Sequence, residues 1–375
     1  MQHSSFIVQR SDLRQTSFAP DAATAAPLPP GSVRLRIDSF ALTANNITYA
    51  AFGEAMKYWN FFPTGDAGQG RIPVWGFADV VESTLEGAEQ LRIGERIYGY
   101  FPIATHAVLQ AARISASGFV DAAAHRRELH AVYNHYTRCN ADPGYQHERE
   151  AQIAILRPLF TTSCLIDDFL ADNAFFGAKT VVLSSASSKT AYGTAFCLAQ
   201  RRGKGDAVNV VGLTSSANLA FTRGLGCYDE VLTYNAVASL PADVATVYVD
   251  MSGSASVRSS VHEHFKHRLT YSCAVGGTHW DALGPPENRS KGMSGPRPTL
   301  FFAPAQIKKR QADWGAAELG QRIALAWTAF MVPVTDARAP WLTVVHGHGP
   351  QAVEAVYREL LDGRTNPQQG HMLSM

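Results

Sequence analysis

The chain has 375 residues, of which 46% are hydrophobic and 17% charged, so it is long enough to build more than one core and we expect two domains. Its 33 Lys and Arg residues balance 32 Asp and Glu residues, and the formal net charge of +1 argues against nucleic acid or an anionic membrane as the main partner. The five cysteines are odd in number and lack a CxxC pair, which favours reduced thiols over a disulfide framework or a Cys-rich zinc site.

The first 120 residues have the texture of a small β-barrel domain. The N-terminal sequence MQHSSFIVQR is too polar for a signal peptide, and no apolar run reaches about 18 residues, so we expect a cytoplasmic protein without a membrane segment. Ser32–Phe40 alternates apolar and polar residues, as a half-buried strand does. Val74–Glu82 and Arg96–Tyr100 are further predicted strands, punctuated by glycines.

Residues 121–156 interrupt this pattern with the polar, aromatic and charged stretch HRRELHAVYNHYTRCNADPGYQHERE. We interpret the segment as a surface insertion or linker. The alternative is a lid or a substrate-facing arm, which would carry Tyr133, Asn134, Tyr136 and Arg138.

From residue 157 the chain alternates helices with short apolar strands. The predicted helices are Phe160–Phe175, Thr190–Gln200, Ser216–Leu225 and Ser254–His267, and the predicted strands are Thr180–Ser184, Ala207–Leu213, Glu230–Tyr234, Thr246–Met251 and Arg268–Val275. This alternation is typical of a doubly wound parallel sheet of the Rossmann type.

After residue 300 we expect one long helix, roughly Ala305–Phe330, and then a strand at Leu342–His346 and a helix at Gln351–Leu361. The predicted organisation is a β-rich domain over residues 1–156 with the polar insertion at its end, a cofactor-binding domain over 157–300, and a part from 301 to 375 that returns to the first domain. The fold class is therefore α/β, a Rossmann domain with a β-rich barrel domain.

The segment Thr180–Gln200, TVVLSSASSKTAYGTAFCLAQ, says most about function. An apolar strand runs directly into small hydroxyl-bearing residues and then a helix, which is how α/β proteins present backbone N–H groups and a helix dipole to a phosphate. The loop lacks the glycines of both the Gly-x-Gly-x-x-Gly motif and the P-loop, and serines at a helix start also serve simply as caps. The residues expected to contact the cofactor are Ser184, Ser185, Ser187, Ser188, Lys189 and Thr190.

The second strand of this domain indicates which cofactor is preferred. An NAD site normally carries an Asp or Glu at the end of that strand, where it binds the ribose. Here the strand is followed by Thr214 and Ser215, with Arg223 further along, and these groups suit a 2′-phosphate, so we expect NADP. Tyr234 and Ser252, at the ends of the next two strands, are added to the predicted cofactor-binding residues.

Several segments resemble the medium-chain dehydrogenase/reductase superfamily, especially its zinc-free quinone-oxidoreductase-like and enoyl-reductase-like branches. They are VRLRIDSFALTANNITYAAFG, IPVWGFADVVES, LRIGERIYGYFP, VVLSSASSKTAYGTAFCLAQ, VVGLTSSANLAFTRGLGCYDEVLTY and VYVDMSGS. RPLFTTSCLIDDFLADNAFFGAKTVVLSSASSKTAYG resembles a subfamily catalogued as a domain of unknown function. The resemblance covers most of the chain except residues 121–156. It implies a GroES-like barrel domain, and it implies that Gly276 and Gly277 contact the nicotinamide.

The chain departs from zinc alcohol dehydrogenases at the positions of their metal ligands. Where those enzymes carry a Cys and a Gly-His-Glu, this chain reads Ala44-Asn45-Asn46 and Trp75-Gly76-Phe77-Ala78, and the four-cysteine structural loop is missing. We therefore expect no metal site. We interpret two groups of histidines as exposed or turn residues, namely His262, His264 and His267, and His346 and His348.

Without zinc, hydride transfer still needs a group that polarises a carbonyl or protonates a carbon. In zinc-free relatives a Tyr or another polar residue of the first active-site loop often has this role, and the matching residues here are Tyr49, Asn45 and Asn46. The alternative for Tyr49 is a packing aromatic. An aromatic-rich stretch predicts a partly apolar substrate pocket, with core packing as its alternative: Met56, Tyr58, Trp59, Phe61 and Phe62.

The sequence thus predicts an NADPH-dependent reductase that acts without metal on an enone, quinone, enoyl or other carbonyl-conjugated small molecule. One alternative is a non-redox enzyme or a nucleotide-binding sensor that keeps the fold. Another is a scaffold that uses residues 121–156 as its contact surface. A homodimer is left open.

Overall fold

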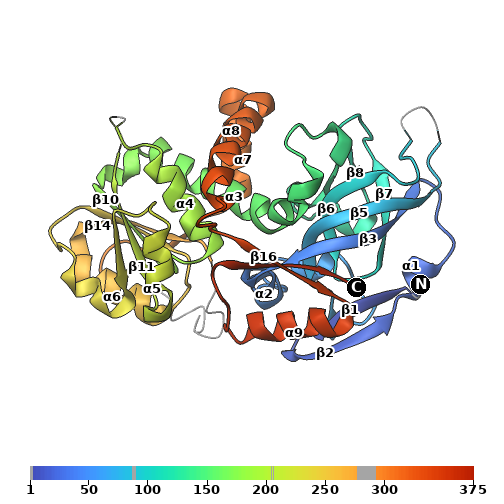
Figure 1. Ribbon diagram of the computed structural model, residues 1–375, viewed down its shortest axis with the longest axis horizontal. Helices are drawn as coiled ribbons and strands as arrows, with labels where there is room; N and C mark the ends of the chain where they lie inside the picture. The colour runs from blue at the N-terminus through green and yellow to red at the C-terminus, as the bar shows by residue number, and fades with distance from the viewer. Residues whose placement is uncertain (1–2, 87–89, 204, 206, 277–292) are drawn as a thin grey trace. The chain divides into compact units, whose positions relative to one another are not determined.

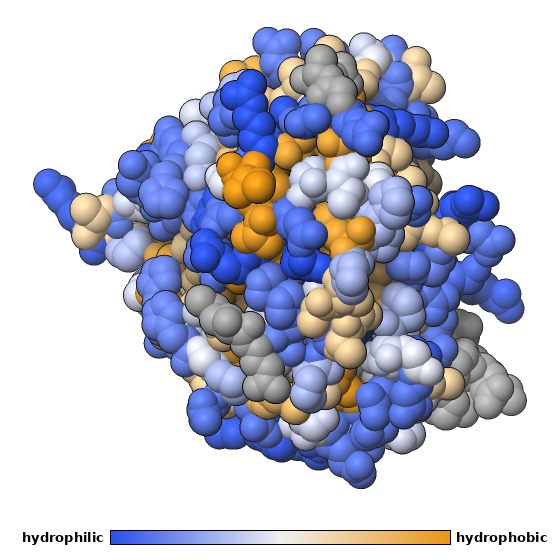
Figure 2. Space-filling model, turned by 90° about the vertical axis from the view of Figure 1, so that its right-hand side faces the viewer, coloured by the Kyte–Doolittle hydropathy of each residue, from blue (hydrophilic) through white to orange (hydrophobic). Residues whose placement is uncertain are grey.

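The computed structural model describes residues 3–86, 90–203, 205, 207–276 and 293–375, and the chain divides into two compact units. Unit 1 comprises residues 1–155, 344–365 and 369–375, and unit 2 comprises residues 156–343 and 366–368. Hydrophilic residues cover most of the face shown in Figure 2, where hydrophobic residues form small separate groups. Among the described residues, no helix combines the length and the apolarity needed to cross a membrane.

Unit 1 is built on an antiparallel barrel. Its large sheet has the strand order β16-β17-β3-β5-β6-β9-β8-β7, and β7 pairs back with β3, which closes six of these strands into the barrel. A second sheet has the order β2-β1-β4. The elements of this unit (Figure 1) are β1 (Ser4–Gln9), β2 (Asp12–Pro20), α1 (Ala22–Ala25), β3 (Ser32–Leu42), α2 (Ala44–Ala51), β4 (Gln69–Gly70), β5 (Pro73–Ser83), β6 (Arg96–Pro102), β7 (His106–Ala112), β8 (Gly118–Asp121), β9 (His135–Arg138), β16 (Thr343–His348), α9 (Pro350–Leu361) and β17 (Gln369–Ser374).

Unit 2 is a parallel sheet with helices packed around it, and its strand order is β12-β11-β10-β13-β14-β15. β10 and β13 are buried along their whole length, as expected for strands of a parallel sheet that helices cover on both faces. The strands are β10 (Thr180–Leu183), β11 (Asn209–Thr214), β12 (Glu230–Thr233), β13 (Thr246–Asp250), β14 (Leu269–Ala274) and β15 (Thr299–Leu300). The helices are α3 (Glu150–Asp172), which begins in unit 1, α4 (Lys189–Ala199), α5 (Leu219–Gly224), α6 (Ala255–Phe265), α7 (Ala303–Trp314) and α8 (Ala316–Val334) (Figure 1). The predicted Rossmann domain and β-barrel are both confirmed.

The single helix expected near residues 305–330 is in fact two helices, α7 and α8. Gly315 between them has a φ of +86°, a conformation that side-chain-bearing residues rarely adopt, so the helix is interrupted there. α8 packs within unit 2, where the ring of Phe330 stacks on Phe160 of α3 at a centroid distance of 4.2 Å. The C-terminal part therefore differs from the expected return of residues 301–375, since α7 and α8 belong to unit 2.

Residues 121–156 are not the surface insertion that their polarity predicts. β9 pairs with both β6 and β8, so this segment supplies a strand of the barrel. The Arg126 guanidinium is buried and pairs with buried Asp121 at 3.0 Å. The ring of Tyr136 packs so closely on Gly99 that a Cβ there would lie 2.3 Å from it. The polar composition led to a wrong prediction because Arg126 has its partner inside the unit, although other charged residues of the segment, such as Arg127 and Glu128, are exposed.

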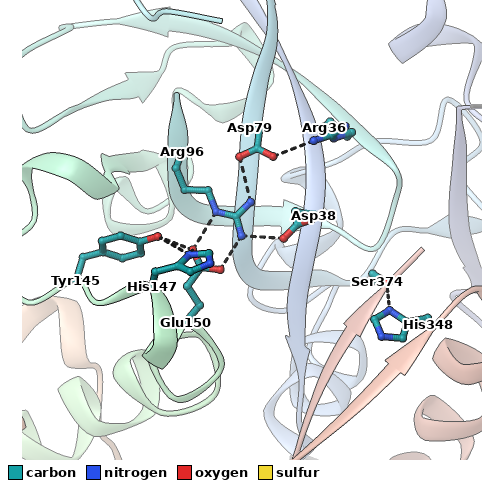
Figure 3. Close-up of polar contacts among 9 residues, drawn as sticks. All are labelled: Arg36, Asp38, Asp79, Arg96, Tyr145, His147, Glu150, His348 and Ser374. Carbon is teal, nitrogen blue, oxygen red and sulfur yellow. Dashed lines mark hydrogen bonds and ion pairs between the residues drawn. The ribbon is translucent and has the colours of Figure 1, made fainter. Parts of the chain in front are cut away.

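The end of the same segment is held by an ion-pair network around Arg96 of β6 (Figure 3). The Arg96 guanidinium contacts Asp38 at 2.7 Å, Asp79 at 3.0 Å and Glu150 at 2.6 Å. The Tyr145 hydroxyl donates to Glu150 at 2.7 Å. Tyr145 and Glu150 are therefore tied to β6 through Arg96, which also pairs with Asp38 of β3 and Asp79 of β5.

Candidate functional site

The segment predicted to bind phosphate, residues 184–188, follows the end of β10, and we call it the phosphate loop. β10 pairs in parallel with β11 and β13, so the loop lies between the ends of these strands. Backbone hydrogen bonds fix it on both sides, from Ser184 N to Val249 O at 3.1 Å and from Ala186 N to Leu213 O at 3.0 Å. Ser185 has a φ of +50°, the left-handed region that glycine enters at lower cost. The first-turn N–H groups of α4 have no acceptor within the helix, so this end of α4 suits an anion.

Two of the predicted hydroxyls, those of Ser184 and Ser252, belong to a buried network around Asp250. Each donates to Asp250 Oδ1 at 2.9 Å. The N–H groups of Ser252 and Gly253 donate to the same oxygen at 3.1 and 3.0 Å. Arg258 donates from Nε to Oδ2 at 2.8 Å. Both serines are fully buried, so their hydroxyls hold the strand ends together within the protein.

Asp250 and Arg258 were missed by the sequence analysis. The available signal was an acid directly after the apolar strand segment Thr246–Val249, with an arginine on the following helix. Their pairing requires that α6 return over the end of β13, which no local pattern reveals. The pair matters for the site because Arg258 balances the carboxylate charge beside the phosphate loop.

Two further hydroxyls of the loop, those of Ser185 and Ser187, contact residues at the ends of β11 and β12. The Ser187 hydroxyl accepts hydrogen bonds from Thr214 Oγ1 at 3.4 Å and from Asn218 Nδ2 at 3.1 Å. Burial raises the pKa of Tyr234, and hydrogen bonds from Ser185 to its hydroxyl partly offset this rise. The structure therefore brings Ser185, Ser187, Thr214 and Tyr234 together at the carboxyl ends of the strands.

The first turn of α4 contains the only cation that was predicted within the loop region. Ser188 is the N-cap residue of α4, and Lys189 follows it. The Lys189 ammonium donates to the carbonyl of Pro367 at 3.3 Å, and burial lowers its pKa to about 8. The carbonyl of Thr190 accepts from the Ser163 hydroxyl at 2.8 Å, which ties this turn to α3.

The other predicted cofactor-binding residues are less favourably placed for contact with a cofactor at the strand ends. Ser215 is the N-cap of the 3₁₀ turn Ser216–Asn218. Arg223 is exposed and donates to the carbonyl of Val231, a residue that pairs with Gly212, so its guanidinium is held short of the end of β11. At Gly276 a Cβ would lie 2.6 Å from the carbonyl oxygen of Met251, so this position accepts only glycine without a shift. Gly277 lies outside the described residues.

In unit 1 the three predicted catalytic residues lie on α2. Asn46 fixes the start of this helix, because its Oδ1 accepts from Thr43 N at 2.7 Å and its Nδ2 donates to Pro73 O at 2.8 Å. Both ends of its amide are therefore in structural use. Asn45 is half-buried and hydrogen-bonds the Tyr49 hydroxyl.

Tyr49 belongs to an aromatic cluster, which we call the tyrosine cluster: Tyr49, Tyr58, Phe61, Phe62, Trp75, Tyr100 and Tyr133. Its rings pack at centroid distances of 4.5 Å between Tyr49 and Tyr58 and 4.7 Å between Tyr100 and Tyr133. The hydroxyls of Tyr58 and Tyr133 are 3.3 Å apart. The buried hydroxyl of Tyr100 has no hydrogen-bond partner among the described residues.

Burial dominates the acid–base properties of this cluster. It raises the pKa of Tyr49, and hydrogen bonds with Asn45 and Tyr133 only partly offset the rise. Burial also raises the pKa of Tyr133 and of Tyr58. These phenols stay protonated at neutral pH, so each can donate a hydrogen bond but cannot act as a general base.

An open cavity of about 270 Å³ borders the tyrosine cluster in unit 1. Leu129 belongs to its lining and also packs on the cluster. The other lining residues, Lys57, Asn60, Ala124, His125, Arg127 and Glu128, are mostly polar.

The part of the chain that the structure describes contains no group of three or more His, Cys, Asp or Glu residues placed to hold a metal ion. Metal independence stays a prediction. One of the histidines interpreted as exposed, His262, is fully buried and bonds Ser272 Oγ at 2.9 Å and Ser294 O at 2.8 Å. That interpretation was wrong for His262, whose partners lie on β14 and beyond.

The family model "Protein of unknown function (DUF2855)" matches residues 40–366, which is most of the chain. The chain belongs to this family. Comparison with curated proteins finds no match.

Several solved structures share the fold. CurA from Vibrio vulnificus in complex with NADPH has a TM-score of 0.60 and 12% identity, with 99% of each chain covered. CurK enoyl reductase has a TM-score of 0.59 and 10% identity over 100% of both chains. A putative NADPH:quinone reductase from Mesorhizobium loti has a TM-score of 0.57 and 12% identity, covering 100% of this chain and 98% of its own. At these identities the likeness establishes the fold, and it confirms the resemblance predicted from the sequence.

Proposed function

We propose that the protein is an NADPH-dependent reductase of a small molecule whose double bond is conjugated to a carbonyl, such as an enone, a quinone or an enoyl compound. The observation that carries the proposal is the phosphate loop at the ends of the parallel strands, with Lys189 in the first turn of α4 and no acid at the end of β11. A 2′-phosphate is favoured over a free ribose hydroxyl by this absence.

The residues of unit 2 fit a bound dinucleotide. A pyrophosphate would be held by the N-terminal turn of α4 and by Ser185 and Ser187, and the adenosine 2′-phosphate by Thr214 and Ser215. The Asp250 carboxylate at the end of β13 does not oppose this because Arg258 pairs with it at 2.8 Å. Solved relatives of the same fold include one bound to NADPH, which supports this choice of cofactor.

The bound nicotinamide would supply a hydride, and the chain's own residues would supply the proton and the polarising hydrogen bond. We assign these tasks to Tyr49, which remains protonated at neutral pH because it is buried. Its bond to Tyr133, whose hydroxyl in turn meets that of half-buried Tyr58, offers a route for the proton from solvent.

A nucleotide sensor without turnover is the second candidate, and one observation favours it. Ser185 takes a left-handed conformation where a glycine would be expected, and its hydrogen bonds go to Tyr234. A dinucleotide must displace that contact to reach the Ser185 N–H, which would weaken binding and slow it.

Titration with NADPH and NADH, followed through the fluorescence of the six tryptophans, tests both candidates. We expect NADPH to bind more tightly than NADH, and we expect its oxidation when an enone or a quinone is added. This activity should survive EDTA. Equal affinity for both cofactors would contradict the NADP assignment, and binding without oxidation by any acceptor would favour the sensor. Loss of turnover with EDTA and its recovery with zinc would overturn the metal-free mechanism.

A further inference from the structure

Two cysteines meet at the contact between α3 and α4 in unit 2. The sulfur atoms of Cys164 on α3 and Cys197 on α4 are 3.6 Å apart. The two residues are 33 positions apart in the sequence, and the chain between them contains β10 and the whole phosphate loop. No spacing rule predicts this pair, because it depends on how the two helices pack.

The contact between the helices is close and is fixed on both sides of the thiols. Near the start of α4, the Ser163 hydroxyl donates to Thr190 O, and a Cβ on Gly193 would lie 2.6 Å from Ser163 Oγ. Beyond the thiols, Arg201 forms a bidentate ion pair with Asp167, at 2.7 and 2.9 Å. The sulfur atoms are therefore held near each other by contacts that do not involve them.

The two thiols differ in their access to solvent. Cys164 is half-buried, whereas Cys197 is 7% exposed. The hydrogen bond to Cys164 and burial raise the pKa of Cys197 well above its ordinary value. A soluble oxidant therefore meets Cys164 first, and Cys197 is placed to react with the product.

We propose that Cys164 and Cys197 form a reversible disulfide when the protein meets hydrogen peroxide. In the first step the Cys164 thiolate attacks one peroxide oxygen, the O–O bond breaks, and a sulfenic acid and hydroxide form. In the second step Cys197 sulfur attacks the Cys164 sulfur, its proton goes to the departing hydroxide, and water leaves. Overall two thiols and one peroxide give one disulfide and two waters. Disulfides of this kind in reducing compartments are transient and respond to redox conditions.

The bond would restrain the segment that carries the phosphate loop. A cross-link across 33 positions removes conformational freedom from the unfolded chain, so the oxidised protein should melt at a higher temperature, by roughly 2–8 °C. The inference does not depend on the proposed reductase activity.

Peptide mapping of the full-length protein after peroxide treatment tests the proposal. Trypsin cuts after Lys179 and Lys189, so the two cysteines lie in different peptides and a cross-linked pair is diagnostic. We expect this pair after peroxide, a mass loss of about 2 Da from the two hydrogens removed, and reversal by dithiothreitol. Cys164→Ser and Cys197→Ser should each abolish the cross-link. Cys227→Ser, which alters a buried thiol elsewhere in unit 2, should retain it.

Three outcomes would overturn the proposal. They are a sulfinic acid on Cys164 with Cys197 still alkylatable, a cross-link between another pair, and complete retention of both thiols at peroxide concentrations that oxidise an exposed model thiol. The map of the unaltered protein decides among these even if a serine variant fails to fold.

Discussion

The phosphate loop of unit 2 and the tyrosine cluster of unit 1 differ in how their hydroxyl groups are hydrogen-bonded. In the loop region, Asp250 accepts hydrogen bonds from two serine hydroxyls, two N–H groups and Arg258, so its carboxylate is saturated. In the tyrosine cluster, the hydroxyls are surrounded by rings, and that of Tyr100 has no partner among the described residues. In the loop region the serine hydroxyls hold the strand ends together, whereas in the tyrosine cluster a hydroxyl such as that of Tyr100 remains without a partner among the described residues.

This difference shows that residue type alone does not identify a ligand-binding hydroxyl. Serine next to a strand end looks available in the sequence, yet Ser184 and Ser252 are committed to Asp250. A buried tyrosine is easily interpreted as a packing residue. Burial nevertheless keeps its hydroxyl protonated, so the hydroxyl can still donate a hydrogen bond or a proton. The partners of a group decide its role.

Removing the Asp250 carboxylate should have the largest effect. In Asp250→Ala, Arg258 is left buried and unpaired, so the unfolding free energy of unit 2 should fall by about 3–5 kcal/mol in urea denaturation. The double variant with Arg258→Met should recover only the part of the loss that comes from the unpaired guanidinium, because the serine hydroxyls and N–H groups still lack their acceptor. Glu318→Ala, which breaks an exposed pair with Arg322, is the control and should change stability by less than about 1 kcal/mol. If Asp250→Ala and Glu318→Ala lowered the unfolding free energy by similar amounts, the hydrogen bonds and the ion pair of Asp250 would not contribute to stability as described.

Tyr49→Phe should have the next largest effect, and on turnover rather than on stability. It removes only the hydroxyl and keeps the ring packed, so turnover should fall by about 10²-fold or more while the affinity for NADPH is unchanged. Tyr357→Phe is the matched control, because it removes a hydroxyl that donates to the carbonyl of Leu13. An unaltered turnover rate in Tyr49→Phe would show that Tyr49 only packs, and Asn45 would then be the candidate donor.

Lys189→Ala should have the smallest of the three effects. It should weaken the binding of NADPH, and the size of this effect should depend on pH. Loss of its ammonium should weaken NADPH binding by about 1–3 kcal/mol at pH 7 in calorimetry. Lys179→Ala, which removes an exposed charge at the opposite end of β10, should leave binding unchanged.

The sign of the pH dependence follows from the lowered pKa of Lys189, about 8. Above that pH the folded protein loses this proton, while a bound phosphate favours the charged form, so binding takes up a proton and the affinity for NADPH should fall as pH rises from 8. Lys189→Arg should remove this fall because a guanidinium stays charged. In the free protein the unfolded chain keeps the proton up to about pH 10.4, so this group destabilises the fold most below pH 8 and progressively less between 8 and 10.4. Affinity independent of pH would mean that Lys189 does not meet the cofactor.

The sequence predicted the Rossmann strands closely because each is a short apolar run that ends in small or polar residues. Thr246–Met251 was expected where β13 covers Thr246–Asp250, and Thr180–Ser184 where β10 covers Thr180–Leu183. The break at Gly315 was missed because a single glycine within an apolar periodic stretch is compatible with one helix. β9 was missed because its segment is polar, and only its pairing with β6 and β8 shows that it is a strand.

The candidate site could be predicted only as far as residue type and strand ends allow. Both indicated the loop from Ser184 to Lys189 and the hydroxyls after β11. Neither could show that Asp250 engages Ser184, or that Asn46 binds Thr43 and Pro73, because these contacts join residues far apart or depend on side-chain direction.

The discontinuity of unit 1 has a consequence for the growing chain on the ribosome. β17 pairs with the end of β3 at Phe40–Leu42, so this edge stays uncovered until residues 371–373 have been made. Nearly all of unit 2 is synthesised in the interval, because it occupies residues 156–343. An open strand edge invites pairing with other chains. The nascent protein should therefore be most prone to mispairing at this edge while its second unit is emerging.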